Sequence, residues 1–482
     1  MNSPGLSRRA LLASTATGAL AATITGWNTA TAAWATHNGP DIAELPTLDG
    51  TMTLQGEGLE RFAGDFGHLV TATPRAVLHP GSVRDVQQLI TFARNHRIPI
   101  AVNGQSGDLA QYGTNGLESH SSFGQANPRG GIAIDARGLS GIHSVHAERA
   151  IVGAGTTWAQ VIEATLPHGW VPPVLPDYLH LTVGGTLSVG GIGAGVQRHG
   201  MQVDNVLELD IVTGTGELLT ASPTHNRELF DATLAGAGQA GIIVRATLAL
   251  TKARERAHVY SLYYDDLNTY LTDQHTLLTT DRFDYQTGDV LRNTDNTHWR
   301  YKAELVALTD TGQTPDTTTL LAGLNPTTTE IVEQSWHEYA YRVDTFANYL
   351  RSTGLWNQPK PWLSLFLPAS TAATFMTEAT EILTPDDIGA GLLLFYPYKH
   401  SKIHTPLAVL PQHEEIGWHF DLLSFPNPHT DTTTTLQRNR HLYNRAVALG
   451  GKRYLIGAIP NMTQTDWQHH YGPLWNQITQ TK

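Results

Sequence analysis

Apolar residues recur at helical spacing in an early segment of the chain, at Val86, Leu89, Ile90 and Ala93. A helix that buries one face produces this period of three to four residues. Ser82 and Asp85 stand just before the run at the spacing of a capping box, so we place the start of the helix there. The apolar run over residues 98–102 then predicts a short buried strand.

The next part of the chain alternates between apolar and polar positions as strands do. We predict strands at residues 149–153, 206–213, 217–221 and 242–250. Gly214-Thr215-Gly216 is typical of a hairpin turn, and Thr156 or Thr157 caps a predicted helix over 158–166. This mixture of short strands and crossing helices indicates the α+β class and not a doubly wound parallel sheet.

The composition changes near Lys252. Residues 253–438 contain more Thr, Tyr, Trp and His, and we interpret them as a second domain. With 482 residues, the chain is long enough for two or three domains with their own cores. The threonine-rich segment Thr432–Thr435 is interpreted as a loop.

Charge and cysteine content narrow the possible partners. The formal net charge of -12 argues against nucleic acid and anionic membranes. The chain has no cysteine, which excludes disulfides, thiolate metal sites and thiol nucleophiles. His469 and His470 are adjacent and not spaced as ligands, so no metal site is expected.

The first residues resemble an export signal. Arg8 and Arg9 precede a weakly apolar run over residues 13–26 and small residues at 30–32. We predict a twin-arginine signal over residues 1–35 and secretion or periplasmic export. The run is too short and too rich in threonine for a membrane anchor. The alternative is a mobile tail with two chance arginines.

Seven glycines fall between Gly184 and Gly200. Their spacing matches neither the dinucleotide fingerprint nor the P-loop. Glycine permits close approach of the backbone to a ligand, and successive N–H groups can cradle phosphate oxygens. From the residues alone, a structural turn and a cofactor cradle are both open.

The stretch Pro176–Ser188, continued to Gly200, resembles the flavin-binding signature of the cytokinin dehydrogenases, in the p-cresol methylhydroxylase (PCMH)-type FAD superfamily. The likeness extends through residues 205–214 and 228–243. It implies an α+β protein with a two-subdomain FAD-binding domain over 55–252. It also implies an α+β substrate domain with an antiparallel sheet over 253–438, and a return to the FAD domain over 439–482.

The resemblance implies FAD as the cofactor and assigns residues to it. The implied FAD contacts are Asn103, Gly104, His120, Ser121, Gln125, Asp177, Thr182, Gly184, Gly185, Ser188, Ile192, Ile242 and Tyr454.

His120 is the implied point of covalent attachment. The family motif Arg-Gly-x-Gly-His-Ser-x-x-Gly-Gln starts here at Asn103-Gly104-Gln105 and resumes at His120-Ser121-Ser122-Phe123-Gly124-Gln125. We therefore place an insertion at Gly107–Ser119 and expect the flavin bond at His120. The alternative is that the insertion disrupts the turn and FAD binds without a covalent bond.

Asp177 is the implied catalytic residue, which accepts a hydrogen bond or a proton from the substrate amine. A carboxylate in a partly dry pocket can have a raised pKa and act as a base. The alternative is that Asp177 caps the glycine-rich turn. His79, His180 and His199 are assigned to structural hydrogen bonds.

Two positions depart from the family pattern. Thr287 and Lys399 stand where the family has a Glu and an Asn that recognise the cytokinin. A Ser and a Gln that contact the cofactor late in the family have no counterpart before Lys482. These departures put an adenine-type substrate in doubt.

We therefore predict an exported FAD-dependent oxidase or dehydrogenase. Hydride passes from a C–H next to an amine or hydroxyl of a small organic substrate to flavin N5, and oxygen or another acceptor reoxidises the flavin. The alternatives are an oxidase of a secondary metabolite or sugar alcohol, and a secreted binding protein without activity on a retired flavoenzyme fold.

Overall fold

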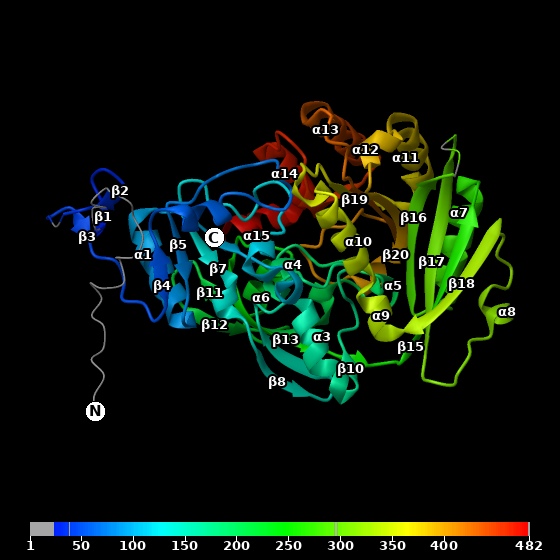
Figure 1. Ribbon diagram of the computed structural model, residues 1–482, viewed down its shortest axis with the longest axis horizontal. Helices are drawn as coiled ribbons and strands as arrows, with labels where there is room; N and C mark the ends of the chain where they lie inside the picture. The colour runs from blue at the N-terminus through cyan, green and yellow to red at the C-terminus, as the bar shows by residue number, and fades with distance from the viewer. Residues whose placement is uncertain (1–23, 38, 294, 296, 481–482) are drawn as a thin grey trace.

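A computed structural model describes residues 24–37, 39–293, 295 and 297–480. The molecule is elongated, and its two parts lie side by side along the long axis (Figure 1). We call residues 24–252 the N-terminal part and residues 253–480 the C-terminal part. Helices and mainly antiparallel sheets occur in both, which confirms the α+β class.

The first sheet of the N-terminal part has four strands. Its order is β4 (Thr51–Thr53), β5 (Ala76–His79), β7 (Ile132–Asp135) and β6 (Ile100–Asn103). The last three strands are parallel, and α1 (Val83–His96) packs on them through the predicted apolar face. The prediction of a capping box at Ser82 and Asp85 was wrong, because the Ser82 side chain makes no capping hydrogen bond. The Asp85 carboxylate accepts instead from the N–H groups of Asp49 and Gly50.

The second sheet of the N-terminal part has five antiparallel strands. Its order is β12 (Leu218–Ala221), β11 (Val206–Thr213), β13 (Gly241–Ala249), β9 (Arg149–Gly153) and β8 (Ile142–His146). The predicted hairpin is confirmed by the pairing of β11 with β12. Helix α3 (Trp158–Thr165) begins with a capping box in which Thr157 and Gln160 bond each other.

One eight-stranded sheet dominates the C-terminal part, at the right of Figure 1. Its order is β18 (Thr328–Ser335), β15 (Arg256–Tyr264), β17 (Trp299–Thr309), β16 (Tyr285–Arg292), β20 (Leu392–Lys399), β21 (Ile416–Leu423), β19 (Leu363–Pro368) and β22 (Lys452–Gly457). All neighbouring strands are antiparallel. β18 is an edge strand, and most of its side chains are exposed.

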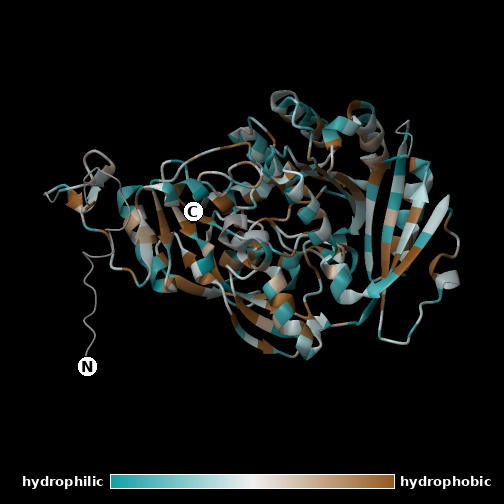
Figure 2. Ribbon diagram, in the orientation of Figure 1, coloured by the Kyte–Doolittle hydropathy of each residue, from teal (hydrophilic) through white to brown (hydrophobic). Residues whose placement is uncertain are grey.

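The two faces of this sheet bury different sets of side chains, as the alternation of apolar and polar residues along its strands in Figure 2 indicates. The outer face is covered by α7 (Leu267–Thr280), α11 (Ala369–Ile382) and α13 (Thr432–Ala448). The inner face turns Leu394 and Tyr396 toward the core of the N-terminal part. The interpretation of Thr432–Thr435 as a loop was wrong, because Asp431 caps α13 and these threonines form its first turn.

Both ends of the described chain pack on the N-terminal part. α14 (Gln464–Tyr471) and α15 (Trp475–Gln480) contribute Tyr471 and Ile478 to its core. Residues 439–482 were expected to return to the FAD domain. Within them, β22 instead pairs with β19 in the eight-stranded sheet. At the other end, β1 (Gly26–Asn28), β2 (Ala33–Ala35) and β3 (Ile42–Ala43) form a small sheet that buries Trp27. Arg8 and Arg9 lie outside the described residues.

Short elements complete the fold. They are α2 (Leu109–Tyr112), β10 (Trp170–Val171), α4 (Val183–Leu187), α5 (Val196–His199), α6 (Arg227–Thr233), β14 (Thr251–Lys252), α8 (Thr317–Leu320), α9 (Trp336–Ala340), α10 (Arg342–Ser352) and α12 (Pro385–Ile388). None of the helices within the described ranges has the length and apolar character needed to cross a membrane.

Candidate active site

The insertion after β6 forms a closed loop. Ser106 and Glu118 exchange two backbone hydrogen bonds, at 2.9 and 3.1 Å. This bridge returns the chain so that Nδ1 of His120 lies 3.2 Å from Oγ of Ser106. The inserted residues therefore form a loop outside the motif, and His120 stays close to the end of β6.

His120 lies among aromatic rings. It stacks on Phe66 at 5.3 Å and lies 5.4 Å from the ring of Tyr178. Its Nε2 is buried and has no hydrogen-bond partner among the described residues. Burial, together with the charges of Arg351 and Lys360, lowers the pKa of His120 to about 3. The imidazole is therefore neutral at ordinary pH, with one nitrogen unused.

The segment after His120 is held by hydrogen bonds. The Asp65 carboxylate accepts from Oγ of Ser121 at 2.7 Å and from the N–H of Gly124 at 2.6 Å. Gln125 accepts from two backbone N–H groups and donates to the carbonyl of Gly457 at 3.3 Å. Ser121 and Gln125 thus fix the loop that carries His120.

The glycine-rich stretch approaches the end of β6 closely. A Cβ on Gly104 would lie 3.1 Å from Oγ1 of Thr182, and one on Gly185 would lie 2.8 Å from the same atom. Nδ2 of Asn103 and Oε1 of Gln105 are buried beside this approach, without a partner in the described part of the chain. Buried polar groups are normally hydrogen-bonded, so these atoms fit a bound ligand.

The other expected FAD contacts lie around this stretch. Oγ of Ser188 donates to the carbonyl of Gly184 at 2.7 Å. The hydroxyl of Tyr454 accepts from the N–H groups of Gly191 and Ile192, at 2.9 and 3.3 Å. Tyr454 therefore ties the C-terminal sheet to the glycine-rich loop. Ile242 lies in β13 and packs against the core under the first sheet.

Asp177 lies on the rim of a pocket between the two parts. The pocket is lined by Leu175, Pro176, Asp177, Ala194, Gly195, Tyr285, Trp336, Tyr339, Ala340 and Arg342. Nη2 of Arg342 donates to Oδ1 of Asp177 at 2.6 Å, and its guanidinium lies 4.3 Å from the Tyr339 ring centre. A larger surface hollow, between α11 and α13 on the outer face, shares none of these residues.

The inner face of the eight-stranded sheet extends this site with charged side chains. Thr287 lies opposite Glu304, and Asp289 lies opposite Lys302, so all four share one face. Nζ of Lys302 is 2.5 Å from Asp289 and 3.1 Å from Glu304. Burial favours neutral Lys302, but these two carboxylates raise its pKa. A carboxylate therefore faces Thr287 from the neighbouring strand.

Asp421 adds a buried acid to the same face. It lies opposite Leu394 and Ser364, and the Ser364 hydroxyl donates to its Oδ1. Burial, and then the charge of Asp177, raises the pKa of Asp421 to about 8. At neutral pH this carboxyl group is mostly protonated and neutral.

Arg342, Glu304, Lys302 and Asp421 are the site residues that the sequence did not reveal. Alternation along 299–309 places Lys302 and Glu304 on one face, but nothing in that pattern shows that the face meets Asp177. Lys399 does not line the pocket, and its Nζ lies 3.9 Å from Asp281.

Comparisons with known proteins agree with this geometry. Residues 74–222 match the model of an FAD binding domain. Residues 320–482 match the model described as cytokinin dehydrogenase 1, FAD and cytokinin binding.

Relatives extend over most of the chain. An uncharacterized oxidoreductase of the fasciation locus of Rhodococcoides fascians is 35% identical over 87% of this chain and 92% of its own length. Cytokinin dehydrogenase 4 of Oryza sativa is 31% identical over 92% of this chain and 90% of its own. Cytokinin dehydrogenase 2 of Arabidopsis thaliana is 31% identical over 92% and 93%.

The fold, the buried unsatisfied groups beside the glycine-rich stretch and the matching FAD-binding domain define an FAD-dependent oxidoreductase. Within that class, the chain belongs to the cytokinin dehydrogenase-like family.

Proposed function

We propose that this protein is a dehydrogenase or oxidase that removes hydride from a C–H next to an amine or hydroxyl of a small organic substrate. The observation that carries the proposal is the position of Asp177. Its carboxylate lies where the glycine-rich motif meets the charged inner face of the C-terminal sheet.

The glycine-rich stretch and the end of β6 would hold FAD, which would supply the hydride acceptor and would pass its electrons on to oxygen or another acceptor. The protein supplies orientation and a base. Arg342 engages Oδ1 of Asp177, which leaves Oδ2 to accept a proton from the substrate amine or hydroxyl. Because Asp421 is neutral at pH 7, it can donate a hydrogen bond to a substrate oxygen or nitrogen on the same face.

Two substrate types have specific support. Glu304 presents a carboxylate opposite Thr287, which supports an amine substrate, such as the cytokinins after which several of the relatives are named. The pair Lys302–Asp289 and the neutral Asp421 support instead a substrate with several hydroxyl groups, such as a sugar alcohol or a secondary metabolite. Flavin bleaching by a panel of amines and polyols under anaerobic conditions separates the two.

Asp177→Asn tests the catalytic assignment. The variant should keep its flavin and slow anaerobic flavin reduction by about 10²–10⁴-fold, the usual effect of a positioned base. Asp281→Asn, in an exposed ion pair with Arg198, is the matched control and should reduce at the natural rate. Unchanged reduction in Asp177→Asn would assign this carboxylate to structure. Natural protein that is colourless and takes up no FAD would favour the non-catalytic binding protein.

We also propose that His120 carries the flavin covalently. Its neutral ring, its unused Nε2 and its return to the end of β6 support this. After acid precipitation, the yellow colour should stay with the natural protein and be released from His120→Ala. His79→Ala, a histidine bonded to Asp135 in the first sheet, should keep the colour. Release from the natural protein would mean that FAD is held without a covalent bond.

A further inference from the structure

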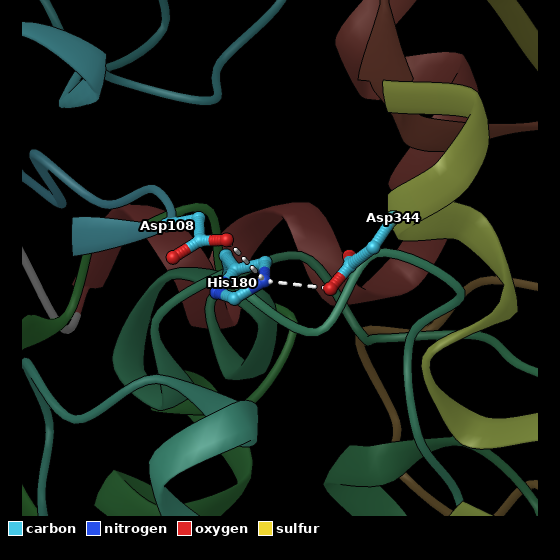
Figure 3. A group of neighbouring side chains, drawn as sticks. All are labelled: Asp108, His180 and Asp344. Carbon is cyan, nitrogen blue, oxygen red and sulfur yellow. Dashed lines mark hydrogen bonds and ion pairs between the residues drawn. The ribbon is translucent and has the colours of Figure 1, made fainter. Parts of the chain in front are cut away.

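Three side chains meet where the insertion contacts the glycine-rich segment and α10, as Figure 3 shows: Asp108, His180 and Asp344. Nε2 of His180 lies 3.1 Å from Oδ2 of Asp344 and 3.9 Å from Oδ2 of Asp108. All three ligand atoms lie within 4.8 Å of one another. The side chains are largely buried, with 17%, 12% and 25% of their surfaces exposed, respectively.

The surrounding structure fixes these groups. Oδ1 of Asp108 accepts from the N–H of Gln111 at 3.0 Å, which leaves Oδ2 directed at His180. The insertion itself is docked on α10, because the Tyr112 hydroxyl donates to Asn348 and the Arg351 guanidinium lies 4.4 Å from the Tyr112 ring centre. The three ligands therefore stand on anchored backbone and not on a loose loop.

The charges of the three groups do not balance. Within the described chain, His180 is the ion-pair partner recorded for both Asp108 and Asp344, and no Lys or Arg pairs with either. One imidazole, even when protonated, carries a single positive charge against two carboxylates. A partly buried carboxylate without a full counter-charge is costly. A bound cation removes this cost.

The distances suit a metal ion. The three ligand atoms form a triangle with sides of 3.1 Å, 3.9 Å and at most 4.8 Å, so a point in its plane lies about 2.0–2.4 Å from each atom. Zinc bonds to nitrogen and oxygen are about 2.0–2.2 Å, within about 0.2 Å of this range. Imidazole and carboxylate together are ligands for zinc and manganese. We propose that Asp108, His180 and Asp344 bind one divalent transition-metal ion, with water in the remaining positions.

Such an ion joins three parts of the molecule. It connects the insertion, the glycine-rich segment and α10, whose first residue, Arg342, holds Asp177. It would therefore fasten the C-terminal part to the N-terminal part next to the pocket. No motif indicates this site, because its ligands are far apart along the chain and one belongs to the insertion.

Metal binding is measured on the full chain after chelator treatment, without reference to activity. Calorimetric titration with ZnCl2 should give one ion per chain. The loss of one ligand in Asp108→Asn or Asp344→Asn should weaken binding by at least about 10-fold, as even outer ligand partners do. Asp310→Asn, in an exposed ion pair with Arg254, should bind like the natural chain. Displacement of the six-line EPR signal of free Mn²⁺ gives a second readout.

Two results would overturn the proposal. One is the absence of stoichiometric Zn²⁺ and Mn²⁺ binding by the natural chain. The other is unchanged affinity in both variants, which would place any bound ion elsewhere. Either result would leave His180 as a structural residue that is hydrogen-bonded to Asp344. Far-UV circular dichroism verifies folding, and if one variant fails to fold, the other variant and the natural stoichiometry still decide.

Discussion

At the scale of single residues, Asp421 makes the stability of the folded chain depend on pH. The unfolded chain ionises this carboxyl group near its ordinary pKa of 3.8, whereas the folded chain keeps it protonated to about pH 8. Between these values the unfolded state binds fewer protons, so this group removes stability as the pH rises from about 4 to 8.

Asp421→Asn should therefore stabilise the protein. The amide oxygen still accepts from Ser364 and has no proton to lose. The advantage over the natural chain should be absent near pH 4 and grow to about 2–4 kcal/mol at pH 8. Urea unfolding at several pH values measures it. Asp265→Asn, an exposed partner of Arg300, should show no such trend, and a constant difference for Asp421→Asn would contradict the assignment.

The predictability of the site differs from residue to residue. His120 and Asp177 lie in local motifs, so the resemblance singled them out before the structure. Arg342 and Asp421 have no motif around them, and their importance depends on which strand or helix meets Asp177 in space. Tertiary proximity of this kind cannot be read from periodicity.

At the scale of elements, the insertion is a closed unit. The Ser106–Glu118 bridge already brings its ends together, so Asp108–Gly116 can be replaced by Gly-Gly without moving His120. The variant should fold and keep its flavin. It should lose the Arg351–Tyr112 contact and the Tyr112–Asn348 hydrogen bond, together worth about 2 kcal/mol, and melt about 2 °C lower.

Thermal melting and flavin content measure this. Tyr349→Ala changes an exposed residue of the same helix and should leave the melting temperature nearly unchanged. Loss of flavin on shortening the loop would show that the insertion itself positions the cofactor.

Strands and helices with a strong period were predicted well, including the β11–β12 hairpin and the Thr157 cap. Two predictions of local structure were wrong. At Ser82, the Asp85 carboxylate binds backbone N–H groups of a segment far away in sequence. At Thr432–Thr435, one Asp cap turns a poor helix-forming composition into the start of a helix. In both cases one side chain decided the local structure.

At the scale of the whole molecule, the proposed export signal over residues 1–35 overlaps the folded N-terminal sheet, because β1 and β2 lie within residues 26–35. Replacing Arg8 and Arg9 with Lys should keep the precursor in the cytoplasm, as immunoblots of cell fractions would show. Normal export of this variant would mean that the pair is incidental. Cleavage near residues 30–32 would remove β1 and its buried Trp27, and Arg75 would lose its bond to the carbonyl of Ala32.

The edge strand β18 has a consequence for solubility. Ile331 and Val332 are 48% and 58% exposed on a strand whose outer backbone groups face solvent. Such an edge invites pairing with another copy of the chain. Glu330 and Glu333 flank the two apolar residues. Glu333 is paired with Arg256, so Glu330 supplies the charge whose repulsion opposes pairing between two copies. Because salt screens that repulsion, concentrated protein should self-associate more readily in high salt than in dilute buffer.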